Sequence, residues 1–398
     1  MLLNTQVKTY LQRSSWIRKM FEKGAELKKE FGADKVFDFS LGNPDLPPPS
    51  SIINEFVKLK ELSSKPLALG YMPNAGLPQL REKLALFLSK EQGVSISREE
   101  VIITCGAAGG INALFRAILE PKDEVVAFAP FFVEYGFYAE NHNGILKVVK
   151  TKEPDFSLDL GALDQAIGEK TRAIILNSPN NPSGQVYSEQ EIKEIADLLR
   201  KKSQKFGKPI FLVADEPYRF LVYDGVEVPS ILKFYEFSVV VSSFSKSLGL
   251  AGERVGYVLV NPDMPNKQEL LAGLVLTNRI LGFVNAPIIG QYLLLAGLGS
   301  LVDISVYQKR RQLMGQILEQ AGLEFTWPKG GFYFFPKAPN KQEDDFITAL
   351  LKENVLAVPG KGFGFPGYVR FAFCVPEETI KRSAEAIGKA VQNILEKY

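Results

Sequence analysis

Short, continuously apolar segments recur between residues 101 and 260, and they restrict the fold more than any other feature of the sequence. Each segment is rich in β-branched residues and is followed by a longer helical or mixed stretch. Strands buried on both faces of a mostly parallel sheet have this pattern, and the helices between them supply right-handed crossovers. The segments are Val101–Cys105, Val125–Ala129, Ala173–Asn177, Ile210–Ala214, Ser238–Ser242 and Val255–Val260.

The last hundred residues have a different pattern. A helical stretch at 302–321 precedes an aromatic segment at 325–336, and a strand at 368–373 precedes a final helix. The N-terminal helical stretch has no sheet of its own, so we expect it to pack with these elements. The sequence therefore predicts an α/β protein with a large domain at residues 42–291 and a smaller α+β domain made of residues 1–41 and 292–398.

Composition excludes several classes of function. The 47 Lys and Arg residues nearly balance the 45 Asp and Glu residues, for a net charge of +2, which argues against a nucleic-acid-coating protein. The 398 residues include only two cysteines, Cys105 and Cys374, and one histidine, His142. A disulfide framework, a His/Cys metal site and any mechanism that needs two histidines are therefore not expected. His142 stands in a polar stretch, and we expect it at the surface.

Neither the N-terminus nor the longest uncharged stretch predicts a membrane segment. The first 32 residues contain an amphipathic helical pattern without the unbroken apolar core of a secretory signal. The stretch 280–301 is interrupted by Asn285, Pro287 and Gln291, so we expect a buried helix there. Free thiols without an export signal favour the cytoplasm.

In open α/β sheets, ligands bind beyond the carboxyl ends of the strands, so the residues directly after each apolar segment are the candidates for a site. Gly106-Ala107-Ala108-Gly109-Gly110 opens a helix after the first segment, where free N–H groups suit a phosphate. The aromatic cluster at 130–135 comes after the second segment and could stack on a flat ring. Alone, the glycine-rich pattern is equally typical of a tight turn between a strand and a helix, and the aromatic cluster is equally typical of core residues.

Polar side chains come directly after the next three segments. Asn181 stands between two prolines at 178–184, and Asp215 begins Asp-Glu-Pro-Tyr, which also suits a helix N-cap. Lys246 comes after a buried segment among serines, and Arg254 comes eight residues later. Together the five segment ends specify a planar, phosphorylated cofactor with a protonatable ring nitrogen and an electrophilic carbon. Pyridoxal phosphate (PLP) has these properties.

These residues also resemble a known family. SPNNPSG at 178–184, DEPY at 215–218 and SFSK at 243–246, with Arg254 beyond, resemble the class I/II aminotransferases of PLP fold type I, in the aspartate aminotransferase superfamily. The resemblance extends from SLGNPD at 40–45 to YVRFAF at 368–373. It implies a seven-stranded sheet, a PLP cofactor, and ping-pong transfer of an amino group from an L-amino acid to a 2-oxo acid, with aspartate among the possible donors.

The resemblance also implies individual roles. Lys246 corresponds to the Schiff-base lysine, Asp215 to the carboxylate that pairs with the ring nitrogen, and Tyr218 and Asn181 to the donors to the phenolic oxygen. Arg370 corresponds to the arginine that binds the substrate carboxylate, a task that suits a bidentate guanidinium. The remaining positions are Gly106, Ala107, Ala108, Ser243, Ser245 and Arg254 for the phosphate, Phe132 for stacking on the ring, Gly42 and Asn181 beside the substrate carboxylate, and Tyr71 for the phosphate of a neighbouring subunit.

Other functions on the same scaffold remain open at this point. A PLP-dependent β-lyase, an α-oxoamine synthase and a non-catalytic PLP-binding protein would share the cofactor residues. The amino donor is also open: Arg279 could reach a second substrate carboxylate from a partner subunit, and Lys361 lies in a Gly-rich loop that could close over the site. The expected partners are small-molecule substrates and a second copy of the chain in a homodimer, with no nucleic acid, membrane or metal.

Overall fold

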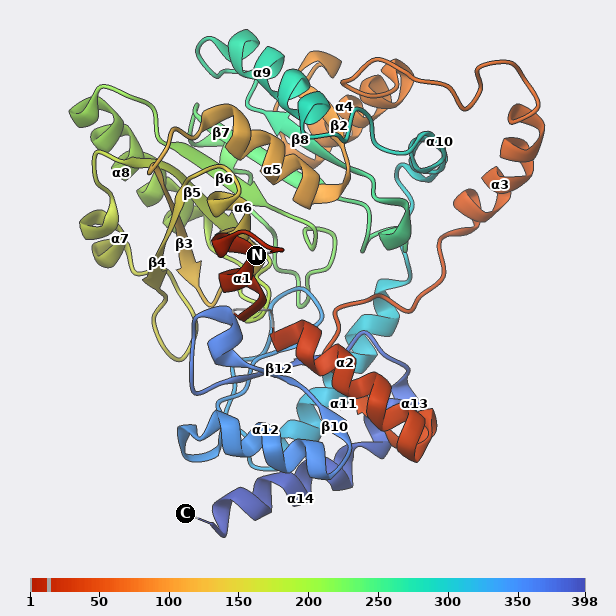
Figure 1. The fold of residues 1–398 in the computed structure, drawn as a ribbon, viewed down its shortest axis with the longest axis vertical. Coiled ribbons are helices and arrows are strands. Elements are labelled where there is room, and N and C mark those ends of the chain that lie inside the picture. Colours follow the sequence, from red (N-terminus) through yellow and green to blue (C-terminus); the bar gives the residue numbers. More distant parts are fainter. Residues whose placement is uncertain (1, 13–15, 398) are drawn as a thin grey trace.

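One seven-stranded sheet organises the middle of the chain (Figure 1). The computed structural model describes residues 2–12 and 16–397. The strand order is β2-β8-β7-β6-β5-β3-β4, and only β8 runs antiparallel to its neighbours. The strands are β2 (Val101–Thr104), β3 (Glu124–Ala129), β4 (Ile145–Lys150), β5 (Thr171–Asn177), β6 (Phe211–Asp215), β7 (Ser238–Ser243) and β8 (Gly256–Val260). The expected mostly parallel, seven-stranded α/β sheet is confirmed.

Helices cover both faces of the sheet, and this explains why its strands are apolar at successive positions. In β2, for example, Val101 and Ile103 belong to the hydrophobic cluster on one face and Ile102 to the cluster on the other. The first face is covered by α3 (Ser50–Leu62), α4 (Pro78–Gln92), α7 (Leu160–Ala166), α8 (Glu189–Phe206) and α10 (Ile288–Gly297), and the second by α5 (Gly106–Ile118), α6 (Glu134–Glu140) and α9 (Lys267–Ile280).

The edge strand β4 was missing from the apolar segments found in the sequence. Its sequence ILKVVK contains two lysines, Lys147 and Lys150, and only Val149 is fully buried. An edge strand with one exposed side does not have the continuous apolar pattern of a central strand. The criterion found the five inner strands and the other edge strand, β2, all of whose residues are buried, but it failed at β4.

A second set of elements packs below the sheet in Figure 1, around its own hydrophobic cluster. It contains α11 (Ile304–Gln320), β9 (Tyr333–Phe334), α12 (Glu343–Lys352), β10 (Val355–Leu356), β11 (Val358–Pro359), β12 (Val369–Ala372), α13 (Glu377–Arg382) and α14 (Ala384–Leu395). The strands β11, β12 and β9 form a small antiparallel sheet in that order. An α+β arrangement was expected for this part of the chain.

The N-terminal segment joins this second set of elements. It forms α1 (Thr5–Gln12), α2 (Trp16–Phe31) and β1 (Phe37–Asp38), and β1 pairs in parallel with β10. The predicted domain boundary at 291/292 falls inside α10, where Leu293 and Leu294 pack against the large sheet. The division of the chain into two domains therefore stays a prediction.

Two further expectations concern single segments. Residues 280–301 contain the ten-residue helix α10, and no helix among the described residues is long and apolar enough to cross a membrane. His142 is not at the surface as expected: it is 6% exposed, and its Nε2 lies 3.2 Å from Asn112 Oδ1. The polar stretch around it folds back onto α5, so a polar sequence context did not mean an exposed side chain.

Candidate active site

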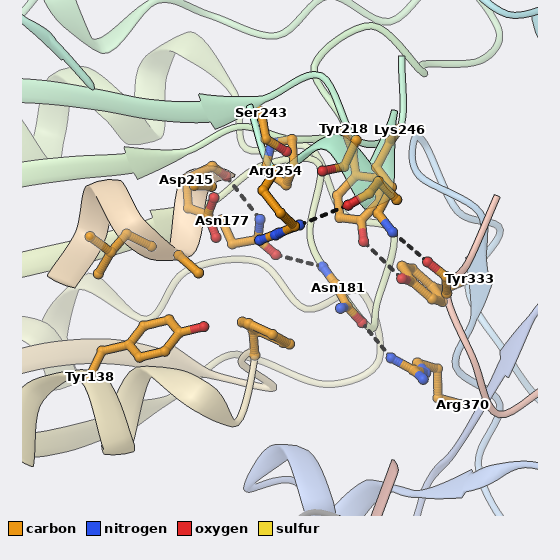
Figure 2. A pocket seen from close by; sticks show the side chains of 18 residues that line it. Tyr138, Asn177, Asn181, Asp215, Tyr218, Ser243, Lys246, Arg254, Tyr333 and Arg370 are labelled. Carbon is orange, nitrogen blue, oxygen red and sulfur yellow. Dashed lines mark hydrogen bonds between the residues drawn. The ribbon is translucent and has the colours of Figure 1, made fainter. Parts of the chain in front are cut away.

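A cavity of about 340 Å³ lies at the carboxyl ends of the strands, between the large sheet and the C-terminal elements (Figure 2). This is the location that open α/β sheets favour for ligands, and the volume suits a small molecule. All the site residues assigned from the sequence, except Gly106 and Tyr71, line this cavity. Its lining consists of Gly42, Ala107, Ala108, Ile111, Phe132, Tyr138, Asn177, Asn181, Asp215, Pro217, Tyr218, Ser243, Ser245, Lys246, Ala251, Arg254, Tyr333 and Arg370.

One end of the cavity is suited to bind an anion. Ala107 and Ala108 belong to the first turn of α5, whose backbone N–H groups have no partner within the helix. Arg254 lies beside this turn in a left-handed conformation with φ 53°. A Cβ at Gly106 would come within 2.8 Å of Arg254 Nη2, so the glycine lets the guanidinium approach the backbone. Gly106 thus shapes this end without lining the cavity.

Asp215, the last residue of β6, places a buried carboxylate in the same cavity. Its Oδ2 accepts a hydrogen bond of 2.5 Å from the Tyr135 hydroxyl, whereas its Oδ1 is buried without any partner. Burial raises the pKa of Asp215 to about 7, the Tyr135 hydrogen bond opposes that rise, and the nearby Glu216 adds to it. A buried carboxylate with one unpaired oxygen calls for a cationic partner.

Lys246 comes after β7 and reaches the centre of the cavity. Its Nζ donates a hydrogen bond of 2.5 Å to the Gly42 carbonyl and lies 5.8 Å from the centre of the Phe332 ring. Burial lowers the pKa of Lys246 to about 8, and the positive charges of Arg370 and Arg254 also lower it. A substantial part of this amine is therefore neutral near pH 8, and a neutral amine can act as a nucleophile or base.

Arg370, on β12, lies at the opposite end of the cavity from α5 and is 1% exposed. Its Nη1 donates to Asn181 Oδ1 at 3.0 Å, and its Nη2 donates to the Ser40 carbonyl at 2.5 Å. Its Nε is buried without a partner, and no carboxylate pairs with the guanidinium among the described residues. A buried guanidinium without an acidic partner is suited to bind a carboxylate from a ligand.

Four residues that were not assigned from the sequence also shape the site. Tyr138 and Tyr333 line the cavity, and Tyr135 holds Asp215 from behind. Asn177 accepts a 2.7 Å hydrogen bond from the Asn181 backbone N–H and donates a 2.9 Å hydrogen bond to the Asp215 carbonyl. It thus joins the ends of β5 and β6. The position of Asn177 as the last residue of a buried strand could have marked it as a site residue. The three tyrosines lie in aromatic segments, and nothing in those segments distinguished them from core residues.

Three candidates lie away from this cavity. Tyr71 is 95% exposed, and Arg279 is exposed at the end of α9. Lys361 pairs with Asp344, and its Nζ lies 4.6 Å from the Trp16 ring. Within one copy of the chain, none of the three residues reaches the site.

The comparisons with known proteins agree with this geometry. The sequence profile described as "Aminotransferase class I and II" matches residues 34–387. The chain belongs to this family. A relative from Aquifex aeolicus, named "Probable aspartate/prephenate aminotransferase", is 31% identical and covers 94% of both chains.

Two solved structures resemble this aminotransferase along its whole length. An aminotransferase from Eubacterium rectale is 39% identical, with a TM-score of 0.94 over 99% of each chain. An aspartate aminotransferase from Thermus thermophilus with maleate is 27% identical, with a TM-score of 0.87 over 98% of this chain and 100% of the other. The expected enzyme class is therefore confirmed.

Class I and II aminotransferases use PLP, and the cavity of this aminotransferase fits that cofactor. Asp215 Oδ1 offers the unpaired buried oxygen that a protonated ring nitrogen needs. The first turn of α5 and Arg254 offer donors for the phosphate, and Lys246 offers the amine. Among the described residues, no group of His, Cys, Asp and Glu side chains could hold a metal ion. The role of each individual residue stays a prediction.

Proposed function

We propose that this aminotransferase moves the amino group of aspartate, or of a similar L-amino acid, to a 2-oxo acid by a ping-pong mechanism, with PLP bound in the cavity. The observation that carries the proposal is the arrangement of Lys246, Asp215 and Arg370 around one cavity. Asp215 and Arg370 are buried and Lys246 is partly buried, and none of the three forms an ion pair with another described residue. PLP supplies an electrophilic carbon and a ring that accepts electrons from the substrate Cα–H bond.

The side chains of the cavity divide the remaining work. Arg370 binds and orients the substrate α-carboxylate, with Asn181 fixing its guanidinium at 3.0 Å. Lys246 Nζ, when neutral, takes the proton from the substrate Cα and returns it on the way to product. Asp215 keeps a proton on the ring nitrogen, and Tyr218 donates to the phenolic oxygen. Backbone N–H groups of Ala107 and Ala108, with Arg254, bind the phosphate.

The first experiment is an absorbance spectrum of the protein with PLP, recorded before and after adding amino acids one at a time. We expect a near-visible band that bleaches with an active donor while the matching 2-oxo acid appears. Lys246→Ala should slow this half-reaction by about 10²- to 10⁴-fold, the usual contribution of a general base. Lys193→Ala, on the exposed surface of α8, is the matched control. Release of pyruvate and ammonia without bleaching would instead favour the β-lyase.

The donor is a separate part of the proposal. The Aquifex aeolicus relative is named for aspartate and prephenate, and the Thermus thermophilus structure holds maleate, a dicarboxylate. The cations that line the cavity in the described part of this chain are Lys246, Arg254 and Arg370, and each already has a role. A second carboxylate would therefore need a cation from outside this copy of the chain.

A second copy of the chain could supply that cation. Exposed apolar side chains occur on α3, on the segment just after it, and on α9 and α10, and exposed apolar side chains of this kind are typical of a homodimer interface. Arg279 lies one turn after Leu276 on the same face of α9, and Leu276 is 46% exposed. Tyr71 belongs to the same region. The exposed apolar residues are Ile53, Phe56, Val57, Leu67, Leu69, Leu276, Ile280 and Ile289.

Complementation tests whether sites are shared between copies. Lys246→Ala and Tyr71→Ala proteins are each expected to be nearly inactive. If Tyr71 completes the site of its partner, a mixed dimer has one intact site, and co-expression should restore about a quarter of the wild-type activity. No restoration, or a monomer in light scattering, would contradict the shared site.

Arg279→Gln should raise the KM for aspartate but not for alanine.

The cytoplasmic location also stays a prediction. Its support is that Cys105 and Cys374 are both free thiols.

A further inference from the structure

Tyr333 lines the cavity beside both Tyr218 and Arg370 (Figure 2). It is the first residue of β9, it is 2% exposed, and it pairs with Ala372 of the strand that carries Arg370. Its hydroxyl lies 2.8 Å from the Tyr218 hydroxyl, and the centre of its ring lies 4.7 Å from the Arg370 guanidinium carbon. One side chain thus contacts both the residue assigned to the phenolic oxygen and the residue assigned to the substrate carboxylate.

The hydroxyl pair has one productive direction. Burial raises the pKa of Tyr333 to about 12 and that of Tyr218 well above its usual value, so both hydroxyls keep their protons near neutral pH. A hydroxyl has one proton to donate. If Tyr218 donates its proton to a ligand, the Tyr218 oxygen can only accept from Tyr333. Donation from Tyr333 then polarises Tyr218 and makes it a stronger donor.

The ring contact with Arg370 is equally specific. The guanidinium lies between two rings, 4.7 Å from the centre of Tyr333 and 4.8 Å from that of Phe363. Aromatic faces attract a buried cation and also fix the plane of its fork. This contact limits the directions in which Arg370 can present its nitrogens to a carboxylate.

Gly42 shows how tightly the tyrosine is fitted. A Cβ at this position would lie 2.0 Å from the Tyr333 hydroxyl oxygen, so any other residue would displace the tyrosine. The Gly42 carbonyl accepts the hydrogen bond from Lys246. The Tyr333 hydroxyl therefore occupies a fixed place beside the backbone that holds the lysine.

We propose that Tyr333 is a positioning residue with two separable functions: its hydroxyl strengthens the hydrogen bond that Tyr218 donates to the cofactor, and its ring orients Arg370 for the substrate carboxylate. The proposal rests on the proposed function, because Tyr218 and Arg370 act on cofactor and substrate there. It predicts that removing the hydroxyl and removing the ring have different consequences.

Tyr333→Phe and Tyr333→Leu separate the two functions. The hydrogen bond that Tyr218 donates reduces the negative charge on the phenolic oxygen of the cofactor. With less negative charge, that oxygen stabilises the proton on the neighbouring Lys246 nitrogen less well. Tyr333→Phe weakens that donation, so the pH midpoint of the cofactor's absorbance band should rise by about 0.5–1 unit, with KM within about twofold of wild type. Tyr333→Leu should shift the band equally and also raise KM for the amino acid and for the 2-oxo acid by about tenfold.

Phe334→Leu is the matched control. Phe334 is the next residue of β9, is fully buried and packs on Phe325, Trp327 and Phe373, away from the cavity. The substitution Phe334→Leu should lower the thermal unfolding temperature without changing either the pH midpoint of the cofactor's absorbance band or the KM. If Tyr333→Leu does not fold, Tyr333→Phe alone decides the hydroxyl function, and Phe363→Leu, which removes the other ring on Arg370, reports on ring orientation through KM.

An unchanged band midpoint in Tyr333→Phe overturns the hydroxyl function, and an unchanged KM in Tyr333→Leu overturns the ring function. Equal shifts in Phe334→Leu would mean that the effects are structural, which also overturns the proposal. Failure of the proposed function is recognised separately, in the wild-type protein: without a cofactor band or a half-reaction, that function and this inference both fall.

Discussion

Replacing Tyr135 by Phe should weaken PLP binding by loosening control of the Asp215 charge. The substitution removes one oxygen from a side chain that is 1% exposed and leaves the ring in place. The lost hydrogen bond is 2.5 Å long and has a carboxylate acceptor, and such bonds contribute about 1.5–3 kcal/mol. At 1.36 kcal/mol per pKa unit, the pKa of Asp215 should rise by about 1–2 units above its value in the native protein.

The pH dependence of PLP binding tests this reasoning. Burial already raises the pKa of Asp215 to about 7, so the native carboxylate is mostly ionised at pH 7.5. In Tyr135→Phe it would be mostly protonated at that pH and would pair poorly with a ring N–H. We expect PLP affinity of the apoenzyme at pH 7.5, measured by calorimetry, to fall by about 3- to 25-fold and to recover towards pH 9.

Tyr138→Phe provides the control for this experiment. Tyr138 lines the same cavity, but the structure of the described residues shows no hydrogen bond between it and Asp215. It should bind PLP with nearly native affinity across the pH range. Equal affinity of Tyr135→Phe and wild type at every pH, or an equal loss in Tyr138→Phe, would refute the argument that this hydrogen bond keeps Asp215 charged.

Three other predictions concern the backbone, stability and substrate binding. Gly256→Ala would put a Cβ 2.5 Å from the Ser242 carbonyl oxygen, whereas a Cβ at Gly168 would meet nothing within 4 Å. Urea unfolding should therefore show a free energy of unfolding lower by about 1–3 kcal/mol for Gly256→Ala and unchanged for Gly168→Ala. Between about pH 4 and 7, Asp215 is protonated in the folded apoprotein but ionised in the unfolded chain, so the stability of the apoprotein should fall as the pH rises through that window. Asp215→Asn should remove this part of the dependence of stability on pH. An unchanged dependence in that variant would contradict the raised pKa of Asp215. Arg370→Lys keeps a charge but loses the planar fork that bonds Asn181, so KM for the amino acid should rise by about 10- to 100-fold, and an unchanged KM would contradict its role in carboxylate binding.

The sequence allowed the main sheet to be predicted because its inner strands are buried on both faces. That same criterion missed β4, where Lys147 and Lys150 interrupt the apolar residues. At the site, Asp215 and Lys246 could be found because each is a charged residue at the end of an apolar strand or within a few residues of it. Such a charge is conspicuous even before the fold is known.

The residues that support the site gave no such signal. Tyr135 and Tyr333 stand in aromatic segments where most neighbours are core residues, and only the tertiary structure brings their hydroxyls to Asp215 and Tyr218. His142 shows the opposite error, because a polar context suggested exposure although the side chain is buried against Asn112. Contacts between segments that lie far apart in the chain decide these cases, and local patterns do not contain them.

The hydrogen bond from Arg370 to the Ser40 carbonyl spans 330 positions along the chain, and β1 likewise finds its partner only in β10. During synthesis from the N-terminus, the sheet strands and Lys246 emerge well before the strand that carries Arg370. The β1 strand and the Ser40 carbonyl can therefore form these pairings only after β10 and Arg370 have been synthesised. Contacts of such long range form slowly and leave apolar surface exposed meanwhile. A nascent chain released before β12 would thus hold Asp215 and Lys246 without Arg370, the residue proposed to bind the substrate carboxylate.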